Sequence, residues 1–132
     1  MKPLKRLKPR PSHDHVGDAA SSVTFFLDDP KDAVWFVEAL RAENLAAFRQ
    51  YDGTPAYMFP QILGKGVVSR VKCPYDCPRY TGKVSYHRGL CPNAEDLLAR
   101  TVAFGLTPVL TASDVNDMIA GIRKVYGALY EG

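Results

Sequence analysis

This sequence lacks several features that would assign it to a class at once. No apolar run approaches the roughly 20 residues that a helix needs to cross a bilayer. The basic start is not followed by an apolar segment, so we expect no export signal. Gly64-Lys-Gly66 has neither the length of a P-loop nor its trailing Lys-Ser/Thr pair. We therefore expect a cytoplasmic protein with no membrane contact and no P-loop chemistry.

Positive charge is scarce outside the first ten residues. Five of the 17 Lys and Arg residues lie before residue 11, and the rest of the chain carries 12 basic against 14 acidic residues. A nucleic-acid-binding domain places its basic residues on a structured face, whereas these lie in a segment broken by three prolines. We expect residues 1–12 to form a flexible basic arm that binds no nucleic acid. Contact with another anionic partner is the alternative.

Cysteine is equally scarce, with three in 132 residues. Cys73, Cys77 and Cys91, taken with His87, have the ligand types of a structural zinc site and follow the pattern C-x3-C-x9-H-x3-C. Common zinc modules use tighter paired spacings. A chain without an export signal also remains in a reducing compartment. We therefore expect reduced thiols, with zinc as the alternative.

The patterns that are present favour a small α/β protein. Residues 23–27 are β-branched and aromatic and predict a buried strand, and residues 45–49 predict a short one. Residues 30–43 predict an amphipathic helix, because Asp28 or Asp29 can cap it and Pro30 suits its first position.

The second half of the chain predicts two further helices after a long connection. Residues 56–92 contain many Gly and Pro residues and one predicted helical turn at 59–63, and a connection this long is usually functional. Asn93 can cap a helix over 94–104, and Thr111 with Asp114 has the spacing of a capping box. Apolar residues at helical spacing follow: Val115, Met118, Ile119, Ile122, Val125, Tyr126 and Leu129. We predict that residues 13–132 form a two-layer α/β sandwich of about three strands and three main helices.

Several short motifs occur in a recognisable order along residues 10–130. They are Asp14-His-Val-Gly-Asp18, Val23-Thr-Phe-Phe-Leu27, Val37-Glu-Ala-Leu-Arg-Ala-Glu43, Pro60-Gln-Ile-Leu-Gly-Lys65, Cys73-Pro-Tyr-Asp-Cys-Pro78, Gly89-Leu-Cys-Pro-Asn-Ala-Glu95, Thr111-Ala-Ser-Asp-Val115 and Ile122-Arg-Lys-Val125. This order resembles the C-terminal small domain of the DegT or StrS family of pyridoxal-phosphate-dependent sugar and cyclitol aminotransferases. The resemblance implies a fold like the C-terminal domain of the aspartate aminotransferase fold.

The resemblance also implies a function for the whole enzyme. Such an enzyme moves an amino group from an amino acid to a keto-sugar or keto-cyclitol, as in nucleotide-sugar or cyclitol biosynthesis. The family carries a Schiff-base lysine in a Ser- and Gly-rich stretch of a large domain, and no lysine here has that context. We therefore expect the large domain to be absent and this chain alone to bind no pyridoxal phosphate and to be inactive.

Three residues on the long connection are implied to face the substrate: Tyr57, His87 and Arg88. The family often has a His two residues before the tyrosine, where this chain has Pro55. A complementary large-domain subunit or a homo-oligomer is the implied partner. The alternatives are a stand-alone, non-catalytic interaction or regulatory module derived from this domain, and a truncated fragment.

Overall fold

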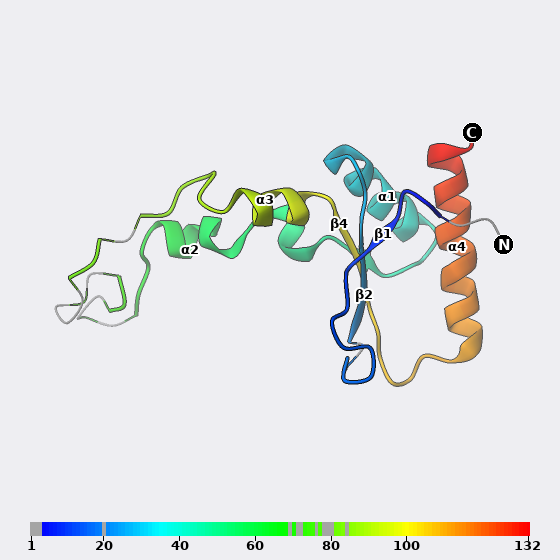
Figure 1. The fold of residues 1–132 in the computed structure, drawn as a ribbon, viewed down its shortest axis with the longest axis horizontal. Helices are drawn as coiled ribbons and strands as arrows, with labels where there is room; N and C mark the ends of the chain where they lie inside the picture. Colours follow the sequence, from blue (N-terminus) through cyan, green and yellow to red (C-terminus); the bar gives the residue numbers. More distant parts are fainter. Residues whose placement is uncertain are drawn as a thin grey trace.

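The computed structural model describes residues 4–19, 21–68, 70, 73–75, 77, 81–83 and 85–132, and it has a four-stranded antiparallel sheet in the order β1-β2-β4-β3 (Figure 1). The strands are β1 (Lys8–Pro9), β2 (Ser22–Phe26), β3 (Ala47–Phe48) and β4 (Thr101–Gly105). The expected mixed α/β class is confirmed, with one strand more than the three that were predicted.

Two long helices begin where the sequence predicts. Helix α1 (Pro30–Ala42) has Asp29 as its N-cap, and the Asp29 carboxylate accepts the Lys31 N–H at 2.7 Å. Helix α4 (Ala112–Tyr130) begins with the predicted capping box, in which the Thr111 hydroxyl accepts the Asp114 N–H and the Asp114 carboxylate accepts the Thr111 N–H. Both caps satisfy backbone donors that a helix start leaves unpaired.

The core lies between these two helices and one face of the sheet. The ring of Phe36 on α1 packs edge-on against Phe25 on β2, with ring centroids 6.1 Å apart. Each large apolar side chain buried here contributes about 2 kcal/mol. The fully buried large side chains are Phe36, Phe104, Leu27, Leu40 and Val102.

The predicted helix over residues 94–104 is wrong in its second half. Helix α3 spans Pro92–Ala99, has Cys91 rather than Asn93 as its N-cap, and is followed by β4. Strand β4 lies between β2 and β3 in the sheet, and its residues from Thr101 to Phe104, whose side chains alternate between the two faces, are all buried. A short apolar run that is buried on both sides has no period to distinguish strand from helix, and this explains the error.

The basic arm has more anchors than its sequence suggests. Strand β1 pairs with β2, and Leu4 and Leu7 pack against the core. The guanidinium of Arg6 lies 4.7 Å from the centroid of the Tyr130 ring, a cation–π geometry. Residues 4–9 of the arm that was expected to be flexible therefore have apolar anchors, while residues 1–3 lie outside the described part of the chain. Flexibility of the arm stays a prediction.

The apolar stripe of α4 is only partly buried. Val125 and Tyr126 join the core and Ile122 packs against it, but Val115 and Ile119 are 42% and 41% exposed. The first half of α4 therefore presents apolar side chains to solvent.

The long connection forms an extension that projects away from the sheet and from α1 and α4 (Figure 1). Its described elements are η2 (Ala56–Met58) and α2 (Pro60–Leu63), and η1 (Gln50–Gly53) and α3 flank it in the sequence. The predicted helical turn corresponds to α2. None of the described helices is long and apolar enough to cross a membrane.

Candidate functional site

Glu95, in the first turn of α3, is the centre of a hydrogen-bonded cluster at the base of the extension. The Tyr57 hydroxyl donates to Glu95 Oε1, and the Gly89 N–H donates to the same oxygen at 2.5 Å. The Tyr57 hydroxyl in turn accepts the Cys91 N–H at 3.2 Å. One carboxylate thus joins η2, the 87–91 turn and α3.

Local sequence explains this arrangement. Pro92 stands in the first turn of α3, where its missing N–H leaves no hydrogen bond unmade. Gly89 has φ 87°, a left-handed conformation that favours glycine, and it turns the chain so that its N–H meets Glu95.

The electrostatics of the cluster favour an ionised Glu95 beside a neutral Tyr57. The hydrogen bond from Tyr57 lowers the pKa of the Glu95 carboxyl, and the Gly89 N–H and the nearby charges of Arg88 and His87 lower this pKa further. Burial raises the pKa of the Tyr57 hydroxyl, and the hydrogen bond to Glu95 raises it further. The tyrosine is therefore held as a proton donor to a carboxylate.

A small cavity of about 210 Å³ lies beside this cluster. Arg88 and Glu95 give it one cation and one anion, and Pro55 is buried in its wall. The remaining lining residues are Gly53, Thr54, Met58 and Ala99. The position where the family often has a His is therefore a buried apolar ring in this chain.

Arg49 is bonded to Ala99, one of the residues that line this cavity. Its Nη2 donates to the Ala99 carbonyl at 3.1 Å, across 50 residues of sequence. A Cβ at Gly53, which has φ 77°, would lie 2.0 Å from this same Nη2. Gly53 therefore permits the guanidinium to join η1 to the end of α3.

The three residues predicted to face a substrate are brought to one place. Tyr57 is half-buried and bonded to Glu95, whereas His87 and Arg88 are exposed on the adjoining turn. The His87 Nδ1 atom lies 3.0 Å from the Arg88 carbonyl oxygen. Glu95 was not among the predicted site residues, although it stands in one of the motifs that carry the resemblance. Its role depends on a turn geometry that the sequence does not reveal.

The cysteines correct one expectation. Cys73 and Cys77 form a disulfide, with Cα atoms 4.3 Å apart, so the prediction that all cysteines are reduced thiols is wrong for this pair. The two cysteines are four residues apart in the sequence, and the turn between them brings their sulfurs together. The prediction of reduced thiols was based only on the expected cellular compartment and did not consider this geometry. Cys91 is a free, exposed thiol. Among the described residues no group of three or more metal-ligating side chains could hold a metal ion.

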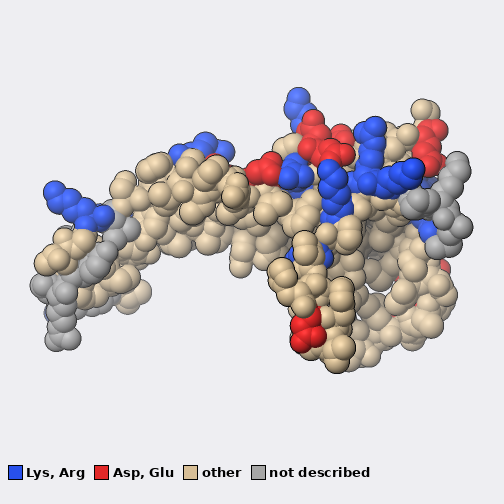
Figure 2. Space-filling model, viewed as in Figure 1, with Lys and Arg blue, Asp and Glu red and all other residues tan. Residues whose placement is uncertain are grey.

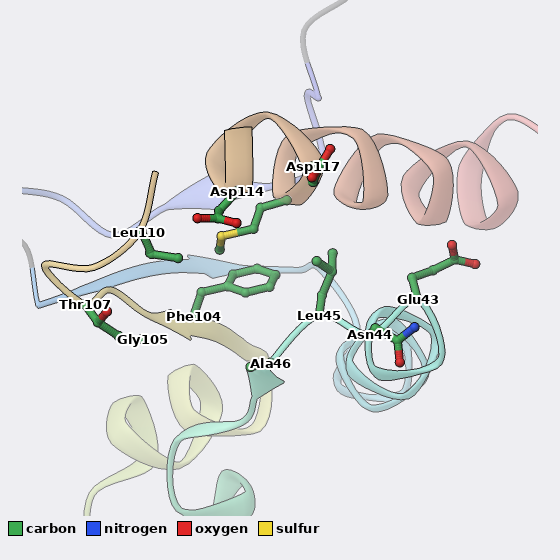
Figure 3. Close-up of a pocket in the computed structure, with 11 residues that line it drawn as sticks. Glu43, Asn44, Leu45, Ala46, Phe104, Gly105, Thr107, Leu110, Asp114 and Asp117 are labelled. Atoms are coloured by element: carbon green, nitrogen blue, oxygen red, sulfur yellow. The ribbon is translucent and has the colours of Figure 1, made fainter. Parts of the chain in front are cut away.

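Two larger cavities lie on the body. One, of about 470 Å³, lies between the 43–46 turn, β4 and the first half of α4, with Leu45 and Phe104 in its wall (Figure 3). The other, of about 510 Å³, lies on the face of the sheet away from α1 and α4. On the face drawn in Figure 2, acidic and basic side chains lie next to one another along the upper part of the body, and its lower part is mostly uncharged.

Pyridoxal phosphate does not fit the described sites. A Schiff base requires a lysine amine inside the binding cavity, and none of these three cavities is lined by a lysine. We therefore derive no chemical step through this cofactor for the isolated chain.

Comparison with known proteins adds no relative: no protein-family model matches the chain, and no curated protein matches it.

Proposed function

We propose that this chain is the C-terminal small domain of an aminotransferase of the DegT or StrS type, acting on a keto-sugar or keto-cyclitol. The large domain, with its pyridoxal phosphate and Schiff-base lysine, would be supplied by another chain. In this proposal the small domain closes one wall of the active site in the cytoplasm and has no activity alone.

One observation carries the proposal: Tyr57 bonds to Glu95, and His87 and Arg88 lie on the turn whose Gly89 bonds to the same carboxylate, although 30 residues separate Tyr57 from His87. A tyrosine hydroxyl and an exposed guanidinium beside a small cavity are suited to hydroxyl and carboxylate groups of a substrate. If Arg88 were only one half of a surface ion pair, it would not need a tyrosine hydroxyl and a cavity beside it.

The two main parts of the proposal can be tested separately. The first test is to express the full chain together with the product of the neighbouring coding sequence, if that sequence encodes a cofactor-lysine domain. We expect the two chains to copurify and to aminate a keto-sugar, using glutamine or glutamate as amino donor. A neighbouring frame that encodes no such domain, or a stable complex without activity, would contradict the proposal.

Variants of this complex then test whether Tyr57 and Arg88 contact the substrate. Tyr57→Phe and Arg88→Met should raise KM for the keto substrate about tenfold each, since each removes a hydrogen bond of roughly 1–2 kcal/mol. Lys31→Met, an exposed change in the first turn of α1, is the matched control and should leave KM unchanged. Equal kinetics for all three variants would remove Tyr57 and Arg88 from the site.

The isolated chain provides an independent test. After borohydride reduction at low cofactor concentration, we expect pyridoxal phosphate to be scattered over several exposed lysines. Stoichiometric labelling of one lysine, such as Lys65, together with turnover of a keto-sugar, would show that the chain has its own cofactor site. Titration of free thiols after rapid alkylation of cell extracts tests the cytoplasmic location. Three free thiols per chain would fit a reducing cytoplasm, whereas one free thiol would mean that the Cys73–Cys77 disulfide persists in the cell and that the proposed location is wrong.

A further inference from the structure

The face of the sheet that α1 and α4 leave open contains a second, larger cavity. Its volume is about 510 Å³, within the range of small-molecule sites. Ser22, Thr24 and Phe26 lie at alternate positions of β2 and form its floor with Thr101 of β4. Helix α3 closes one side with Leu97 and Leu98.

This cavity is distinct from the Tyr57–Glu95 site. Ala94, Leu97 and Leu98 of α3 face the open side of the sheet, whereas Glu95 and Ala99 face the smaller cavity. Residues at these spacings lie on different sides of a helix. Helix α3 is therefore a partition with one cavity on each side.

The floor and rim carry polar groups that the fold does not use. Among the described residues, the side chains of Ser22, Thr24 and Gln50 make no hydrogen bond to another protein group. The Thr101 hydroxyl, by contrast, donates to the Leu97 carbonyl at 2.6 Å and is already satisfied. Two hydroxyls and one amide thus remain available on one concave surface.

Arg10 adds a positive charge at the rim. Its backbone N–H donates to the Thr24 carbonyl at 2.9 Å, which fixes the residue beside the floor. Its guanidinium forms an ion pair with the Asp18 carboxylate at 3.8 Å, which is beyond hydrogen-bond distance, and the Arg10 side chain is 53% exposed. The five donors of the guanidinium can therefore reach an anionic group at the mouth of the cavity.

We propose that this cavity binds a small hydroxylated organic anion, of about the size of a sugar acid or a sugar phosphate. The anionic group of this ligand pairs with Arg10. The ligand's hydroxyls bond to Ser22, Thr24 and Gln50, and its carbon skeleton packs on the apolar wall of Phe26 and Leu97. The observation is independent of the proposed aminotransferase role, since no residue is shared between the two sites.

The experiment is an NMR titration of the full chain with D-glucuronate, D-glucose 6-phosphate and D-glucose, following backbone amides around Thr24 and Gln50. We expect saturable shifts with an anion and at least tenfold weaker binding of uncharged D-glucose. Tighter binding of glucuronate identifies the anionic group as a carboxylate, and tighter binding of glucose 6-phosphate identifies a phosphate ester. No shifts at tens of millimolar of either anion, or equal binding of D-glucose, would overturn the proposal.

Variants locate the binding. Arg10→Met should weaken binding of the anion about tenfold, while the control Lys31→Met, on the other face of the sheet, should not change it. Thr24→Val keeps a β-branched side chain of similar shape and should preserve the fold while weakening binding several-fold. Dispersed amide spectra of each variant establish that it is folded. Folded Arg10→Met and Thr24→Val variants that bind as tightly as the unchanged chain would overturn the assignment.

Discussion

Substituting alanine for the two glycines inside α4 should have opposite effects on stability. Gly127 has no heavy atom within 4 Å of the position that a Cβ would take. At Gly121 the same Cβ would lie 2.6 Å from Leu45 Cδ1, which is closer than carbon atoms approach without repulsion. The same chemical change is thus placed once in open space and once against a packed side chain.

The expected magnitudes follow from this geometry. Alanine is favoured over glycine in a helix interior by about 1 kcal/mol, so Gly127→Ala should gain close to that amount. Overpacking costs about 1–3 kcal/mol, and the cost at Gly121 should be in the lower part of this range. The reason is that Leu45 also lines the cavity of about 470 Å³ beneath α4, into which its side chain can turn (Figure 3). After the gain of about 1 kcal/mol for alanine in a helix, Gly121→Ala should therefore lose up to about 1 kcal/mol net.

Urea titration measures the free energy of unfolding of each variant. The variants needed are the two glycine substitutions, Leu45→Ala, and the double variant Gly121→Ala/Leu45→Ala. In the Leu45→Ala background the clash is gone, so Gly121→Ala should become stabilising and the coupling energy should be about 1–2 kcal/mol. The Gly127→Ala change should be additive with Leu45→Ala. If Gly121→Ala stabilises the unchanged chain as much as Gly127→Ala does, α4 does not pack against Leu45 and the reasoning is refuted.

Three further predictions concern other parts of the molecule. Ile122→Ala should lower the free energy of unfolding by about 1–3 kcal/mol, because Ile122 is half-buried against the core; a loss below about 0.5 kcal/mol would place it outside the packed interface. The pKa of Glu95 is lowered in the folded chain, so its contribution to the free energy of unfolding is complete above the ordinary pKa of 4.5 and is lost as the pH falls through the folded-state pKa. In an acid titration, Glu95→Gln should lack this pH-dependent loss of stability. Limited proteolysis should cleave exposed loops before residues 8–10, where β1 pairing protects the chain; cleavage at residues 8–10 as fast as in those loops would show that β1 opens freely.

The sequence predicted those elements whose boundaries depend on local chemistry. Asp29 with Pro30 and Thr111 with Asp114 begin α1 and α4, since caps are satisfied within a few residues of the chain. β4 was mistaken for helix because its side chains are buried on both faces of the sheet, and β1 was missed because the residues that it pairs with lie 16 and 18 positions further along the chain. Neither the burial of β4 nor the pairing of β1 produces a periodic pattern in the local sequence.

The candidate site was predictable only in part. Tyr57, His87 and Arg88 came from the resemblance, but no spacing rule places residue 57 beside residue 95. The open sheet face with Ser22 and Thr24 was not anticipated, because alternating polar residues on a strand ordinarily indicate a solvated surface. Only the position of α3 makes that surface concave.

The two outer strands of the sheet have a consequence for how copies of this chain behave at high concentration. Each is two residues long, and β1 consists of a lysine and a proline, which lacks a backbone donor. Short edges with charge and proline are poor templates for adding a further strand from another molecule. Growth of an extended intermolecular sheet is therefore disfavoured, and light scattering of concentrated protein should show no fibrillar species. We therefore expect an assembly of this chain to use helix or loop surfaces, such as the exposed Trp35 of α1.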